Sequence, residues 1–169
     1  MCISKKVVIA LSGHSASGKT YLADFIANNL NIPVRHCGEV LKEYAKNKSI
    51  NFQSLSNADH IAIDQETVAW IKDVDSLALV VEGRFLRNFL EPCQEFYVYH
   101  FEVIAPPPTR VKRFLARNTL NSINESDAQD NDFILTHYNN LQLSSQILRS
   151  EVEKDLHVAL DLIKDIVFR

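Results

Sequence analysis

The stretch Val7-Val-Ile-Ala-Leu-Ser-Gly13-His-Ser-Ala-Ser-Gly-Lys19-Thr20 decides the fold of this chain. Its first five residues are apolar without interruption, which is typical of a strand covered by helices on both faces. The octapeptide from Gly13 to Thr20 has the spacing G-x-x-x-x-G-K-[ST]. Apolar side chains then recur at helical spacing over residues 20–30. The sequence therefore predicts a strand, a phosphate-binding loop and a helix, in that order.

Each constant position of this loop has a physical task. Gly13 and Gly18 permit backbone angles and a close approach that a side chain would prevent. The amide groups of the loop and the positive end of the following helix can then surround an anion. We expect Lys19 to reach the β- and γ-phosphates of ATP, and the Thr20 hydroxyl to ligate Mg²⁺. The predicted nucleotide-binding residues are Gly13, His14, Ser15, Ala16, Ser17, Gly18, Lys19 and Thr20.

The rest of the chain alternates between strand-like and helix-like segments, which predicts an α/β fold with a parallel sheet. Strands are expected at residues 7–11, 34–37, 77–81 and 95–105. Helices are expected at residues 20–30, 38–47, 53–73, 106–118 and 133–153. The tail at 155–169 has two interpretations: a fifth strand at 156–160 before a short helix, or helix throughout.

Length and composition indicate one soluble domain covering residues 1–169. Of the 169 residues, 46% are hydrophobic and 23% are charged, as in ordinary globular domains. The net charge of −3 offers no broad basic surface for nucleic acid or an anionic membrane. Cys2, Cys37 and Cys93 are scattered, which argues against disulfides and for a cytoplasmic location. The apolar run at 7–11 is too short for a secretion signal or a membrane span.

Three further segments resemble a known family. They are Cys37-Gly-Glu-Val-Leu-Lys-Glu-Tyr-Ala45, Val80-Val-Glu-Gly-Arg84 and Arg110-Val-Lys-Arg113-Phe-Leu-Ala-Arg117. Together with the loop at 13–20, they resemble the cytidylate kinase-like branch of the nucleoside monophosphate kinases over residues 5–120. The resemblance implies a P-loop NTPase fold of the adenylate/cytidylate kinase type, which is a three-layer parallel sheet with helices on both faces. It also implies an acceptor-binding region at about 38–75 and a short lid at about 113–135.

The resemblance implies roles for four residues beyond the loop. Lys42 occupies the place of a basic residue that meets the acceptor phosphate, and Arg84 resembles the arginine that grips this phosphate. Asp64 resembles an acidic residue that contacts the acceptor base or sugar, and Glu82 could order Mg²⁺ or its waters. The structural alternatives are a solvated Lys42, a capping or surface Asp64, and a simple ion pair between Glu82 and Arg84.

Arg110, Arg113 and Arg117 make a separate argument, because their spacing places them on one face of a helix. Like charges on one face repel each other unless an anion lies against them. In the resembled family this helix leads into the lid, whose arginines offset the charge of the transferring phosphate. We therefore predict that Arg113 and Arg117, with Lys19 and Arg84, are catalytic. The alternative is a solvated basic face paired with acidic residues.

Residues 118–148 contain no lysine or arginine, whereas Asp127, Asp130 and Asp132 bring negative charge to the expected lid. This departure from the resembled family leaves three functions open. The leading hypothesis is Mg²⁺-dependent transfer of the γ-phosphoryl group of ATP to a nucleoside monophosphate, with CMP or dCMP as first candidates. The second is a kinase for another small metabolite, such as dephospho-coenzyme A or a sugar acid. The third is a catalytically weak, regulatory nucleotide-binding protein.

The expected partners are small-molecule nucleotides, with no nucleic acid and no membrane among them. The sequence makes no prediction about oligomeric state.

Overall fold

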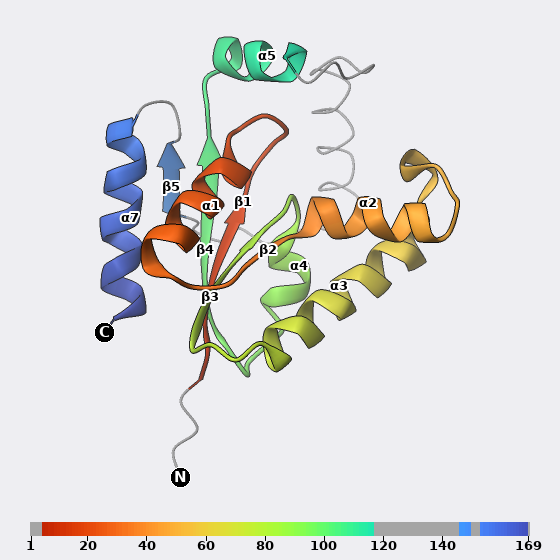
Figure 1. Cartoon of the computed structure of the whole chain (residues 1–169), viewed down its shortest axis with the longest axis horizontal. Coiled ribbons are helices and arrows are strands. Elements are labelled where there is room, and N and C mark those ends of the chain that lie inside the picture. The colour runs from red at the N-terminus through yellow and green to blue at the C-terminus, as the bar shows by residue number, and fades with distance from the viewer. Residues whose placement is uncertain (1–4, 117–145, 150–152, 169) are drawn as a thin grey trace.

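The computed structural model describes residues 5–116, 146–149 and 153–168 of the chain. Within these residues, five parallel strands form one sheet in the order β2-β3-β1-β4-β5 (Figure 1). The strands are β1 (Val7–Ser12), β2 (Val34–His36), β3 (Ala78–Glu82), β4 (Tyr97–Ile104) and β5 (Gln146–Arg149). The parallel α/β sheet predicted from the sequence is therefore confirmed.

Helices cover both faces of the sheet, which gives the three expected layers (Figure 1). They are α1 (Lys19–Leu30), α2 (Cys37–Asn47), α3 (Asn57–Asp73), α4 (Leu86–Leu90), α5 (Pro107–Leu115) and α7 (Glu153–Val167), with a 3₁₀ helix at Phe52–Ser54. Helices α1 and α7 share one buried cluster with the sheet, and α3 and α4 share the other. In the described ranges, no helix has both the length and the apolar character needed to cross a membrane.

Strand β1 contributes to both cores because its side chains alternate between the two faces of the sheet. Ile9 and Leu11 lie in the cluster under α1 and α7, whereas Val8 and Ala10 lie in the cluster under α3 and α4. All four are fully buried. Burying a valine, leucine or isoleucine side chain contributes about 1.5–3 kcal/mol, so the strand that leads into the loop is held firmly from both sides.

Helix α3 begins at Asn57 because Ser56 and Asp59 form a capping box. The Asp59 amide donates to the Ser56 hydroxyl at 3.2 Å, and the Ser56 amide donates to the Asp59 carboxylate at 2.9 Å. The same carboxylate accepts hydrogen bonds from the Tyr44 hydroxyl at 3.0 Å and the Lys48 ammonium at 2.8 Å. These bonds fasten α2 to the start of α3. They also explain why the helix predicted at 53–73 is divided into a 3₁₀ turn and an α-helix.

The C-terminal part differs from the sequence-based prediction. The pattern predicts a helix at 133–153, but Gln146–Arg149 form β5, which pairs with residues 101–104 of β4. The tail is one helix, α7, so the fifth strand precedes the tail and does not lie at 156–160. The prediction is wrong at β5 because a short strand is stabilised by pairing with a sheet edge, which local pattern does not reveal. The remainder of that expected helix up to 145, and the expected lid from residue 117 on, lie outside the described residues.

Candidate active site

The site lies at the carboxyl edge of the sheet, where the strand order changes direction. Strand β1 stands between β3 and β4, so the chain extends to one side through β3 and β2 and to the other through β4 and β5. Leu11 is in register with Glu82 of β3 and with Phe101 of β4. The segments that follow these three strands therefore meet at one edge. Open α/β sheets bind their ligands at such a position.

The loop after β1 has the backbone that its glycines predict. Gly13 and Gly18 have φ angles of 151° and 92°. A Cβ atom at Gly13 would meet the carbonyl oxygen of Val103, so no other residue fits there without moving the β4 backbone. Ala16 is also left-handed, with φ of 60°, although that conformation costs a non-glycine residue about 1 kcal/mol or more. The curled loop has the shape that lets successive amide groups face an anion.

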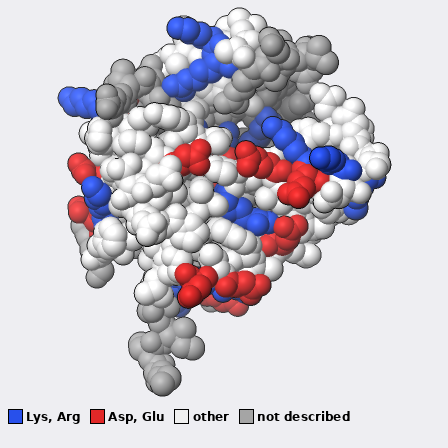
Figure 2. All heavy atoms as spheres, viewed as in Figure 1, with Lys and Arg blue, Asp and Glu red and all other residues white. Residues whose placement is uncertain are grey.

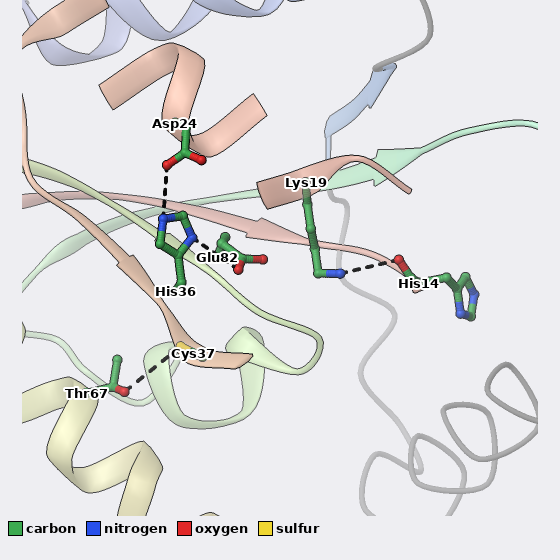
Figure 3. A network of polar contacts seen from close by, with 7 residues as sticks. All are labelled: His14, Lys19, Asp24, His36, Cys37, Thr67 and Glu82. Atoms are coloured by element: carbon green, nitrogen blue, oxygen red, sulfur yellow. Dashed lines mark hydrogen bonds and ion pairs between the residues drawn. The ribbon is translucent and has the colours of Figure 1, made fainter. Parts of the chain in front are cut away.

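Helix α1 starts at Lys19, directly after Gly18, so its N-terminal amides face the loop. Its first turn contains no acidic residue, which keeps the positive end of the helix available to an anion. Lys19 folds back over the loop, and its Nζ donates to the carbonyl oxygen of His14 at 3.3 Å (Figure 3). Thr20 follows in the same first turn and is partly exposed. The structure therefore brings Lys19 and Thr20 to the same end of the loop.

Three arginines from other segments hydrogen-bond to the same loop. Arg84, which follows β3, donates from Nη2 to the Oγ of Ser15 at 2.7 Å. Arg110 on α5 donates from Nε to the carbonyl oxygen of Ser15 at 3.1 Å. Arg113, one turn further along α5, donates from Nη1 to the carbonyl oxygen of Ser17 at 3.1 Å. The predicted shared face of Arg110 and Arg113 is thus confirmed, and it is turned toward the loop.

Positive charge is gathered at this edge of the molecule. Figure 2 shows basic side chains around α5 and between α5 and α2, in the orientation of Figure 1, while acidic side chains lie mainly across the middle and lower parts. Arginine guanidinium groups match phosphate oxygens in geometry and charge. The cluster therefore favours a polyphosphate ligand over a neutral one. Arg117, the third residue of the predicted stripe, lies outside the described residues.

Glu82 and Arg84 have different hydrogen-bond partners among the described residues, so the simple ion pair considered above does not account for them. Glu82 is only 5% exposed at the end of β3, and its Oε1 lies 3.3 Å from Nδ1 of His36. The Nε2 of His36 lies 3.0 Å from Oδ1 of Asp24 on α1 (Figure 3). Sequence reasoning missed His36 and Asp24. The only local signal is that His36 ends a short strand directly before the Cys37-Gly segment.

The residues predicted to bind the acceptor lie on α2 and α3. Lys42 is exposed on α2. Asp64 is half-buried on α3, and burial raises the pKa of its carboxyl to about 6. Burial is the main cause that raises the pKa of the Cys37 thiol to about 12, and the negative charge of Asp64 adds to the rise. Thr67, one turn after Asp64 on α3, contacts the Cys37 sulfur at the start of α2. Asp64 is not the residue that caps α3, since Ser56 does that.

The residues present fit a nucleoside triphosphate with Mg²⁺. Gly13 lets the loop pack directly against the Val103 carbonyl oxygen of β4, and the positive φ angles of Gly13, Ala16 and Gly18 keep the loop backbone curled. Mg²⁺ in phosphoryl-transfer sites is held by one or two protein oxygens together with phosphate oxygens and water. The Thr20 hydroxyl and the Glu82 carboxylate are oxygen donors of the kind it prefers.

This fold and this loop define a P-loop NTPase-type α/β protein. The sequence matches the protein family described as AAA domain over residues 9–133, and the chain belongs to this family.

Solved structures with the same fold include TT1252 from Thermus thermophilus, at a TM-score of 0.69 and 14% identity, covering 96% of this chain and 98% of that one. Shikimate kinase from Bacteroides thetaiotaomicron has a TM-score of 0.63 and 13% identity, with 96% and 99% of the two chains covered. These likenesses confirm the P-loop NTPase type of α/β fold.

A cytidylate kinase from Desulfurococcus amylolyticus is 26% identical to this chain over 118 residues, which cover 66% of this chain. The match spans only 61% of the length of that relative.

Proposed function

We propose that this protein is a kinase that transfers the γ-phosphoryl group of ATP to a nucleoside monophosphate, with CMP or dCMP as the first candidates. The observation that carries the proposal is the convergence of one lysine and three arginines on the loop after β1. Catalysis of phosphoryl transfer consists largely of positioning and of positive charge around the reacting group. The 26% identity to a cytidylate kinase supports a nucleotide acceptor.

On the donor side, the loop amides and Lys19 bind the β- and γ-phosphates of ATP. Thr20 and Glu82 would hold the Mg²⁺ ion, which when bound neutralises charge on those phosphates. The positive end of α1 adds to the attraction, because its first turn contains no acidic residue to oppose an anion. Arg113 stabilises the transferring phosphoryl group from the side of α5, and the sequence pattern assigns Arg117 the same task.

On the acceptor side, Arg84 and Lys42 hold the phosphate of the monophosphate. Asp64 lies on the neighbouring helix, and with a pKa of about 6 it is mostly ionised at neutral pH. It can then accept hydrogen bonds from a base amino group or a sugar hydroxyl. The acceptor phosphate is already an anion, so the reaction requires no general base. Two positive residues on this side favour a phosphorylated acceptor over a neutral one.

The test is a coupled assay of ATP turnover with each common ribo- and deoxynucleoside monophosphate in turn. Dephospho-coenzyme A and a panel of sugar acids serve as competing acceptors, and reactions containing EDTA serve as metal-free controls. We expect CMP or dCMP to raise turnover well above the acceptor-free rate, and EDTA to abolish the increase.

Turnover raised only by dephospho-coenzyme A or a sugar acid would replace the monophosphate by that acceptor. Tight binding of ATP with Mg²⁺, seen by calorimetry, without transfer to any acceptor would favour the regulatory nucleotide-binding role instead.

A further inference from the structure

Three polar side chains form a continuous set of contacts below the phosphate-binding loop. His36 Nε2 lies 3.0 Å from Oδ1 of Asp24, and His36 Nδ1 lies 3.3 Å from Oε1 of Glu82 (Figure 3). The histidine ends β2, the glutamate ends β3, and the aspartate lies in the second turn of α1. The contacts therefore join three separate elements at the carboxyl edge of the sheet.

The contact with Glu82 matters because this carboxylate is buried. The Glu82 side chain is 6% exposed and the His36 side chain 15% exposed. A buried carboxylate without a hydrogen-bond donor is strongly unfavourable. Among the described residues, His36 is the side chain in contact with the Glu82 carboxylate, and its Nδ1 can donate to Oε1 in the tautomer that carries the proton on that nitrogen. The imidazole ring thus determines which way the carboxylate faces.

The contact with Asp24 connects the same ring to the helix that carries Thr20. Residues four apart in a helix lie on one face, so Asp24 stands one turn below Thr20 on the same side of α1. The Asp24 side chain is 49% exposed, so burial does not require it to pair. Through the His36 ring, the Asp24 contact instead connects the second turn of α1 to Glu82 at the end of β3.

We propose that His36 is a positioning residue that holds the Glu82 carboxylate in one orientation relative to Thr20, so that both oxygens can serve one Mg²⁺ ion. The inference rests on the proposed function, which assigns these two residues to the metal. Groups that hydrogen-bond to metal ligands fix the orientation of those ligands, and their replacement typically lowers metal affinity about 10–100-fold.

Two substitutions separate the two contacts of the ring. An asparagine at position 36 can place its amide nitrogen near the position of Nδ1 and so donate to Glu82. A glutamine reaches further, toward the position of Nε2, and so favours Asp24. Both variants keep a polar side chain at position 36. They therefore avoid the loss of folding stability that an apolar residue beside the buried Glu82 carboxylate would cause. Asp161→Asn, at a carboxylate on α7 that is 79% exposed, is the matched surface control.

The measurement is the affinity for adenylyl imidodiphosphate by calorimetry, with and without Mg²⁺. The ratio of the two dissociation constants gives the gain in affinity due to the metal, independently of catalysis. We expect His36→Gln to reduce this gain about tenfold or more, with the metal-free affinity unchanged. His36→Asn and Asp161→Asn should keep most of it. Thermal unfolding of the ligand-free variants checks that each is folded.

An unchanged gain in His36→Gln would overturn the inference while leaving the proposed function in place. An equal loss with and without the metal would also overturn it, because that result would mean a general disturbance of the loop. A wild-type protein with no gain from Mg²⁺ would refute the proposed metal site and this inference together.

Discussion

Arg84 reaches Ser15 across 69 positions of the chain, where its Nη2 donates a 2.7 Å hydrogen bond to the serine Oγ. The bond joins the segment after β3 to the loop after β1, and it holds an exposed guanidinium group at the edge of the site. Arginine at this place combines charge with a planar, forked set of donors, whereas lysine would keep only the charge.

We therefore expect Arg84→Lys to lower kcat/KM for the acceptor by about 10–100-fold, which corresponds to about 1.4–2.7 kcal/mol of transition-state stabilisation. Steady-state kinetics with varied acceptor at saturating ATP measures the effect. Ser15→Ala removes the hydrogen-bond partner but keeps the guanidinium, so its loss should be smaller. Equal losses in the two variants would show that Arg84 acts on the loop and not on the acceptor.

Lys19 folds back over the loop that precedes it, with its Nζ 3.3 Å from the carbonyl oxygen of His14. Lys19→Ala should lower kcat by roughly a hundredfold or more, the usual effect of removing a positioned charge from a transition state. The fold should persist, since Lys19 is not part of either core. Lys164→Ala on α7 is the control for loss of a lysine. Undiminished turnover in Lys19→Ala, with normal circular dichroism, would contradict the assignment.

Alanine substitutions at Gly13 and Gly38 form a matched pair that tests where the backbone requires glycine. Gly13 has a φ of 151°, and a Cβ atom there would meet the Val103 carbonyl oxygen. Gly13→Ala should therefore lower the free energy of unfolding by about 1–3 kcal/mol and weaken nucleotide binding. Gly38 lies in α2, where a Cβ atom would point into open space away from its own helix, so Gly38→Ala should raise stability by about 0.5–1 kcal/mol. Urea unfolding measures both, and changes of the same sign would contradict this account.

Asp64 should make stability depend on pH. Burial raises its pKa in the folded protein from 3.8 to about 6, so the folded state binds this proton more tightly than the unfolded state. Stability should therefore fall as the pH rises from about 4 to about 6, and the full penalty should be present above that range.

Asp64→Asn removes this penalty. At pH 7.5 we expect the variant to be about 1 kcal/mol more stable than the wild type, allowing for solvent screening of a half-buried group. Near pH 4 the difference should almost vanish. Thermal melts at the two pH values test the sign, and a gain of equal size at both would show that burial of the charge is not its cause.

Much of the fold can be predicted from local pattern. The uninterrupted apolar run of β1 predicts a buried central strand, and the alternation of strand-like and helix-like segments predicts the parallel sheet. The exception at β5 is instructive. Its four residues, Gln146–Arg149, become a strand because the edge of β4 is available for pairing, and nothing in their own sequence requires that.

The candidate site divides in the same way. The loop residues and Lys19 could be predicted because they are consecutive and each has a fixed task. His36 could not be assigned a partner, because the carboxylates it contacts lie 12 and 46 positions away. The helical spacing of Arg110 and Arg113 predicts a shared face, but not the object that this face meets.

By itself, the sequence determined the phosphate-binding loop, the strand before it and the helix after it, because neighbouring residues fix local backbone and burial pattern. Only the tertiary structure decided that Arg110 would meet Ser15, 95 positions away, and that His36 would join Asp24 to Glu82. Such contacts depend on which strand ends are adjacent in the sheet. That adjacency results from the packing of the whole chain and is not encoded in any one segment.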